Sequence, residues 1–283
     1  MSKKFVKFPP VFFHLDKDFS LFEKSKNIQF ASQRLRDYAT GLKFYALMYQ
    51  EPAFTCAQIG LFQNLMVCSK SGMLIDRSVT PFDPVTREDL ENNFRDPKNT
   101  QITTKITEKA FDAFLKSNLN QQFEVYANPK IVDYGKQSRL VKESSINFFY
   151  LQAQIERFTE ITVLFDDENL DEKEIILTGQ HAINFQKAFD YLQGKTILDI
   201  PRNWGRIEMD PVARQQLPEF ARRFDELFAE IRMFTEDAES IKNLRNPNEP
   251  YPEFLEEEFD RQFDALLEEA VNEYEAKFDP DHE

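Results

Sequence analysis

Residues 160–192, EITVLFDDENLDEKEIILTGQHAINFQKAFDYL, are the stretch that decides the fold class. The segments EITVLF and EIILT are rich in β-branched residues and flank an acidic loop, DDENLDEK, which is typical of an antiparallel hairpin. Thr178 then begins a helix that runs to Leu192, and its apolar face comprises Ala182, Phe185, Phe189 and Leu192. Antiparallel strands followed by a helix predict an α+β protein.

The same order of elements occurs earlier in the chain. Residues 42–49 (LKFYALMY), 53–62 (AFTCAQIGLF) and 65–68 (LMVC) have the composition of strands, and a helix is expected over residues 108–119. That helix and the later one share the string Lys-Ala-Phe-Asp, at 109–112 and 187–190. We therefore predict a duplicated antiparallel body over residues 1–195, with modules of about 5–119 and 120–195 that each end in a helix.

The last third of the chain has a helical pattern. Residues 196–245 are expected to form a connecting loop and an amphipathic helix, and residues 251–283 a long acidic amphipathic helix. The apolar stripe of the terminal helix must dock on its own body, on a second copy or on another protein. We predict a homodimer, with a partner-binding surface that comprises Glu256, Glu257, Phe259, Phe263, Leu266, Glu269 and Tyr274.

Charge is distributed unevenly along the 283 residues, which carry 49 acidic and 35 basic side chains for a net charge of −14. Residues 1–150 hold 21 basic against 16 acidic residues, whereas residues 251–283 hold 2 against 13. The net negative charge therefore belongs largely to the terminal helix. Such asymmetry indicates different partners for the two ends of the chain.

No familiar catalytic pattern is present in the sequence. The three histidines, His14, His181 and His282, have no metal-ligand spacing, and the chain lacks a Gly-rich nucleotide loop and a GxSxG motif. The acidic run at 166–174 lacks the glycine and the alternation of an EF-hand loop, which favours a solvated hairpin tip. The sequence thus predicts a protein that is not an enzyme, with no catalytic residue, metal or cofactor.

The N-terminal residues MSKKFVKFPPVFF are interrupted by Lys7 and two prolines, so a signal peptide is not expected, and no stretch is apolar enough to span a membrane. Cys56 and Cys68 lie among apolar neighbours, which favours buried thiols in a reducing compartment. A disulfide between them stays open, because sequence does not give its geometry. These features predict a cytoplasmic protein, or one inside an infected cell if it is viral.

Two successive modules of about four strands and a helix, over residues 5–193, resemble the Whirly family of single-stranded nucleic-acid-binding proteins. The resemblance rests on the order of elements and on the shared Lys-Ala-Phe-Asp string. It implies a duplicated fold whose sheets bind single strands. The Lys-Gly-Lys-Ala motif of that family is not found here, so none of its site residues is transferred.

The first functional hypothesis is single-stranded RNA or DNA binding, which combines basic side chains with aromatic platforms. On a strand over residues 42–49, Lys43, Tyr45 and Tyr49 would share one face. Further binding residues are expected elsewhere in the body: Arg34, Arg36, Lys105, Arg139, Lys142 and Tyr150. The alternative for the same residues is an ordinary sheet surface.

The second hypothesis is an acidic interaction protein. The terminal helix and the acidic stretch 156–174 would present carboxylates to a basic protein, such as the nucleic-acid site of a host nuclease or polymerase. The overall charge favours this hypothesis, and the basic first half of the chain favours the first.

Overall fold

The computed structural model describes residues 11–12, 23–82, 84, 101–102, 108–144, 146–148, 151–197, 207–209, 211–216, 218, 221–222 and 224–226. Their contacts divide the chain into two compact units. Unit 1 comprises Met1–Asn93, Gln101–Leu140 and Glu156–Thr196, and unit 2 comprises Phe94–Thr100, Val141–Ile155 and Ile197–Glu283.

Unit 1 contains a five-stranded sheet in which every neighbouring pair is antiparallel. In spatial order its strands are β2 (Ala53–Thr55), β3 (Leu65–Ser69), β5 (Phe123–Tyr134), β8 (Glu160–Asp166) and β9 (Glu172–Thr178). The β8–β9 hairpin is continuous in register from Glu160 opposite Thr178 to Asp166 opposite Glu172. The predicted α+β class with antiparallel strands is therefore confirmed.

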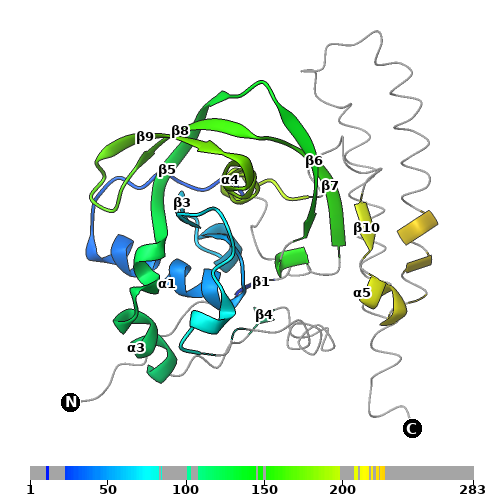
Figure 1. The fold of residues 1–283 in the computed structure, drawn as a ribbon, viewed down its shortest axis with the longest axis horizontal. Coiled ribbons are helices and arrows are strands. Elements are labelled where there is room, and N and C mark those ends of the chain that lie inside the picture. The colour runs from blue at the N-terminus through cyan, green and yellow to red at the C-terminus, as the bar shows by residue number, and fades with distance from the viewer. Residues whose placement is uncertain are drawn as a thin grey trace. The chain divides into compact units, whose positions relative to one another are not determined.

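Helices cover both faces of this sheet (Figure 1). One face packs against α4 (Gly179–Leu192), whose Ala182 and Phe185 join Met66 and Cys68 of β3 in one buried cluster. The other face packs against α1 (Gln33–Met48), where the Tyr45 and Phe54 rings stack with centroids 5.7 Å apart. Because successive strand residues point to opposite faces, β3 is buried at all five positions.

The prediction of a strand over residues 42–49 is wrong, because this segment forms the second half of α1. The helix begins after Ser32, whose hydroxyl accepts a hydrogen bond from the Leu35 N–H at 3.2 Å. From Gly41 to Met48 every residue is buried. A helix enclosed on all sides has no polar stripe, so its sequence lacks the 3.6-residue periodicity by which a helix is recognised.

The remaining elements of unit 1 are short. They comprise α3 (Glu108–Lys116), the 3-10 turns η1 (Ala57–Ile59), η2 (Arg77–Val79) and η3 (Asn118–Gln122), and the pair β1 (Val11–Phe12) and β4 (Gln101–Ile102). The helix expected over residues 108–119 is thus present. After β3 the chain turns at Gly72, whose φ is 68°.

A second sheet has three strands, in the order β10-β7-β6. They are β6 (Ser138–Ser144), β7 (Leu151–Phe158) and β10 (Ile207–Met209), with the 3-10 turn η4 (Ile146–Phe148) between β6 and β7. Helix α5 (Pro211–Gln216) follows β10, within residues 196–245, where a connecting loop and a helix were expected.

Several predictions are neither confirmed nor refuted here. Residues 227–283 lie outside the described residues, and with them the partner-binding set Glu256, Glu257, Phe259, Phe263, Leu266, Glu269 and Tyr274. The duplication of modules and the domain boundary near residue 195 stay predictions.

Cys56 and Cys68 are free and buried, as expected, and burial raises the pKa of the Cys68 thiol to about 12. Such thiols are protonated and unreactive at neutral pH. Within the described part of the chain, no helix combines the length and apolar character that a bilayer span requires.

Candidate functional site

A small pocket lies in unit 1 between α4, the start of β2 and the turn η1. Its lining consists of Glu51, Pro52, Ala53, Gln58, Asn184, Lys187, Ala188 and Tyr191. The cavity volume is about 10 Å³, roughly the space of one water molecule. Two charged side chains and two amide side chains converge on this small pocket, and this makes it the candidate functional site.

Helix α4 contributes half of the lining through one stripe of its surface. Asn184, Lys187, Ala188 and Tyr191 are spaced at i, i+3, i+4 and i+7, so they follow one face of the helix. A different stripe, with Ala182, Phe185 and Leu192, is buried against the sheet, as the sequence predicted. The core contact therefore fixes the rotation of α4 and turns the polar stripe towards the pocket.

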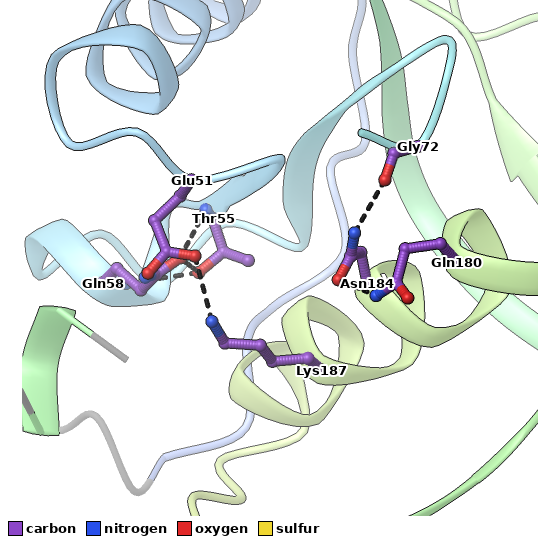
Figure 2. A network of polar contacts seen from close by, with 7 residues as sticks. All are labelled: Glu51, Thr55, Gln58, Gly72, Gln180, Asn184 and Lys187. Carbon is purple, nitrogen blue, oxygen red and sulfur yellow. Dashed lines mark hydrogen bonds and ion pairs between the residues drawn. The ribbon is translucent and has the colours of Figure 1, made fainter. Parts of the chain in front are cut away.

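An ion pair crosses the pocket. The Lys187 Nζ atom lies 2.9 Å from Glu51 Oε2, and the two side chains are only 18% and 15% exposed (Figure 2). The Glu51 backbone is held by a hydrogen bond that its N–H donates to the Ala46 carbonyl of α1 at 2.9 Å. At this low exposure, solvent screens the attraction less than it would at the surface.

The remaining polar groups are fixed by their neighbours. Gln58 Oε1 accepts hydrogen bonds from the backbone N–H of Thr55 at 3.0 Å and from its hydroxyl at 3.3 Å. Asn184 Nδ2 donates to the Gly72 carbonyl at 2.7 Å, and its Oδ1 accepts from Gln180 at 3.1 Å (Figure 2). Contacts within the protein thus fix the orientation of these two pocket side chains, which lowers the entropic cost of binding a ligand.

Two further contacts hold α4 in place. Gln186 Nε2 donates to the Phe158 carbonyl at 2.7 Å, and its Oε1 accepts from the Phe158 N–H at 3.1 Å. Arg157, which is buried, pairs with Asp190 at 2.5 Å. Gln186 and Asp190, four residues apart on one side of the helix, therefore anchor α4 to the end of β7.

His181, in the first turn of α4, gives the region a pH dependence. Desolvation lowers its pKa below the ordinary value of 6.5, and its buried Nε2 has no hydrogen-bond partner among the described residues. As the pH falls, the unfolded chain therefore takes up a proton before the folded chain does. The stability that neutral His181 contributes is complete above the unfolded pKa and is lost as the pH falls through the folded pKa.

We accordingly predict that, as the pH falls below the ordinary histidine pKa of 6.5, the unfolding free energy falls more steeply in the native protein than in a His181→Gln variant. Urea titrations at a series of pH values measure this difference. The other titrating groups contribute equally to the pH dependence of both proteins, so their contribution cancels in the comparison. Parallel curves would contradict the prediction.

Comparison with known proteins identifies the family. The family model for polypeptide deformylase matches residues 13–204, which is more than half of the chain and includes every residue of the pocket. This chain belongs to the peptide deformylase family. Two curated relatives agree with this assignment. A peptide deformylase of Aquifex aeolicus (strain VF5) is 30% identical over 106 residues, which is 38% of this chain and 62% of that protein.

The second relative is a peptide deformylase-like protein of Rickettsia conorii (strain ATCC VR-613 / Malish 7), 29% identical over 93 residues, or 33% of this chain and 49% of that protein. The chain thus spans 62% and 49% of these deformylase relatives. Among solved structures, the peptide deformylase of Legionella pneumophila is similar with a TM-score of 0.48 and 15% identity, over 80% of this chain and 98% of that one.

The family assignment corrects both functional hypotheses. The Whirly resemblance is wrong, and so are single-stranded nucleic acid as the partner and a viral function, because the matched family is that of the deformylases. The acidic inhibitor of a nuclease or polymerase has no support either. The prediction that the protein is not an enzyme is overturned, because the family consists of enzymes named for removing formyl groups from peptides.

The structure also explains why the proposed aromatic platform fails. Tyr45 and Tyr49 lie on a helix, and both are buried in a stack with Phe54. Lys43 is buried too, and its Nζ lies 3.0 Å from Glu168 in the acidic β8–β9 loop. These three side chains share no exposed face that could receive a base.

Four of the other residues predicted to bind nucleic acid make contacts within the protein. Arg34 donates to the Tyr38 hydroxyl, and Arg36 to Asn169 of the acidic loop. Arg139 donates to Gln180 at 2.9 Å, and Lys142 lies 3.3 Å from Glu208. Lys105 and Tyr150 are outside the described residues.

None of the pocket residues was singled out from sequence. Glu51 precedes residues 53–62, which have the composition of an ordinary strand, and Gln58 lies within them; Lys187 belongs to the string used as evidence of duplication. One signal was available. Asn184, Lys187 and Tyr191 form a second helical stripe beside the apolar one, and a polar stripe next to a core face is a candidate pocket lining.

The pocket residues do not fit a metal ion. Amide hydrolysis is chemistry for which many hydrolases bind a divalent ion through histidine, cysteine or carboxylate ligands. Of the lining residues only Glu51 is such a ligand, and it is paired with Lys187. Within the described ranges, no three His, Cys, Asp or Glu side chains are grouped so that they could hold an ion.

Proposed function

We propose that this protein acts on the N-terminal end of peptides, as a member of the deformylase family, and holds that end in the pocket beside α4. The observation that carries the proposal is that the family match covers all the elements that build the pocket. Because the chain spans only part of the length of its curated relatives, the activity, the substrate and the site are all part of the proposal.

The Lys187–Glu51 pair is chemically suited to a peptide end. A formylated end presents a carbonyl oxygen and an amide N–H side by side. The Lys187 ammonium donates to a carbonyl oxygen, and the Glu51 carboxylate accepts from an N–H. Hydrogen bonds with one charged partner are stronger than neutral ones, so both contacts favour binding.

The pocket must open for this to happen. Its cavity holds about one water molecule, and the two charged groups are in direct contact at 2.9 Å. A ligand therefore enters between Lys187 and Glu51 and replaces their mutual ion pair with two contacts to itself. Binding then depends on both side chains and weakens when either is removed.

Calorimetric titration with formyl-Met-Ala-Ser and with unformylated Met-Ala-Ser tests the proposal. We expect the native protein to bind the formylated peptide, and a Lys187→Ala variant to bind it at least about tenfold more weakly, since a hydrogen bond to a charged group contributes about 1.5–3 kcal/mol. Lys173→Ala is the matched control, because that lysine pairs with Asp167 at the tip of the β8–β9 hairpin, away from the pocket lining.

Two results would overturn the proposal. One is that the native protein binds neither peptide. The other is that Lys187→Ala and Lys173→Ala bind the formylated peptide with the same affinity as the native protein. Circular dichroism of each variant confirms that α4 is still folded.

A further inference from the structure

We infer that in this pocket the Lys187–Glu51 ion pair stands where a metallohydrolase of the same helical geometry holds a divalent metal ion, so that the pocket works without one. The inference rests on the proposed function for the identity of the ligand. It concerns which group supplies the positive charge in the pocket, and it can be tested separately from peptide binding.

The first argument is the spacing on α4. The motif HExxH places two metal-binding histidines at i and i+4 on one helix face and a general-base glutamate at i+1. In this chain the pocket receives residues at the same spacing from α4, and they are Lys187, Ala188 and Tyr191. The helix therefore offers the positions of a metal site with different side chains in all three.

The second argument is the chemistry of those side chains. An ammonium group has three donors and no lone pair with which to bind a metal. Alanine has no ligand atom, and a tyrosine hydroxyl must first lose a proton whose ordinary pKa is about 10. Ala188 and Tyr191 are buried at 3% and 2% exposure, so neither leaves room for a ligand from solvent.

The third argument is charge. Glu51 is the only carboxylate in the lining, and Lys187 already neutralises it at 2.9 Å. A divalent cation entering the pocket would meet the Lys187 ammonium, a like charge, in place of an uncompensated anion. The lysine supplies positive charge for a carbonyl oxygen, which is one of the tasks that a metal performs in a hydrolase.

The test begins with the native protein. After purification and extensive dialysis against zinc and cobalt salts followed by buffer, elemental analysis should find no metal that depends on the pocket. Any formate release from formyl-Met-Ala-Ser, and the binding of that peptide, should be the same with and without a chelator. Glu51→Gln is measured in parallel, because it removes the one carboxylate that the pocket could offer an ion.

A designed variant tests the spacing argument. The triple substitution Lys187→His, Ala188→Glu and Tyr191→His removes the ammonium and provides two imidazoles beside Glu51, which together make the His₂Glu ligand set of a catalytic zinc site. We expect this variant to bind one equivalent of Co²⁺ with the visible absorption of a tetrahedral complex. Adding Glu51→Gln should weaken that binding about tenfold or more.

The outcomes are distinct. Metal that is bound by both the native protein and the Glu51→Gln variant lies outside the pocket, and this result supports the inference. One equivalent of native metal that is lost in Glu51→Gln, or chelator-sensitive formate release, overturns it. Failure of the native protein to bind peptide refutes the proposed function and leaves the metal result valid.

Discussion

Replacing Phe185 by alanine should lower the free energy of unfolding by about 4 kcal/mol, the usual cost of removing a fully buried phenylalanine side chain. Phe185 is 0% exposed and lies at the centre of the contact between α4 and the sheet. Its ring meets Tyr126 edge-on, with centroids 5.0 Å apart, and stacks on Phe189 at 6.2 Å. The loss combines burial, the aromatic contacts and the cavity that remains.

Phe30→Ala provides the matched control, because it makes the same chemical change at a ring that is 80% exposed. Its expected cost is within about 0.5 kcal/mol, as for surface substitutions in general. Urea titration of both variants gives the comparison. Equal losses would mean that α4 does not depend on this core contact.

The Phe185 contact also shows which part of the fold the sequence could predict. The hairpin β8–β9 and helix α4 could be predicted from residues 160–192, because each has one buried and one more exposed side. Such an arrangement requires a regular alternation of polar and apolar residues, which is visible in the sequence. The second half of helix α1 shows no such alternation of polar and apolar residues, because all of its sides are buried. There the apolar run fits a strand as well as a helix, and only tertiary packing decides between them.

The functional site could not be predicted from the sequence, and the reason is different. Its charged pair joins Glu51, just after α1, to Lys187, in the middle of α4, and nothing local to either residue indicates the other. The positive charges in the sequence also led to the wrong residues being predicted as a binding surface. Lys43 and Arg36 suggested a basic surface, but the fold brings them to Glu168 and Asn169 of the acidic loop, where the opposite charge or a polar partner satisfies them.

A second large loss of stability is expected from a substitution at Gly72. This residue follows β3, and its carbonyl group contacts the pocket residue Asn184. The φ of Gly72 is 68°, a region that disfavours any residue with a side chain. A Cβ atom there would also lie 2.4 Å from the Cβ and 2.5 Å from the Cα of His181. Backbone atoms of a helix anchored to the core cannot yield cheaply, so the loop must move away from α4.

We therefore expect Gly72→Ala to lower the unfolding free energy by about 3 kcal/mol, from about 1 kcal/mol of backbone strain and about 2 kcal/mol of overpacking. The movement has a functional consequence, because the Gly72 carbonyl accepts the hydrogen bond from Asn184 Nδ2 that orients this side chain of the pocket. Peptide affinity should fall in the same variant, measured at a temperature at which the protein is fully folded.

Gly179→Ala separates the two causes of the loss at Gly72. Gly179 also has a positive φ, 58°, but no atom lies within 4 Å of the place that its Cβ would take. It carries the same backbone strain without the collision, so we expect a loss of about 1 kcal/mol and unchanged peptide affinity. If the two alanine variants lose equal stability, the contact between Gly72 and His181 is not what holds the loop beside the pocket. A larger loss at Gly72, together with weaker peptide binding, would show that the close approach of this loop to α4 is required to build the pocket.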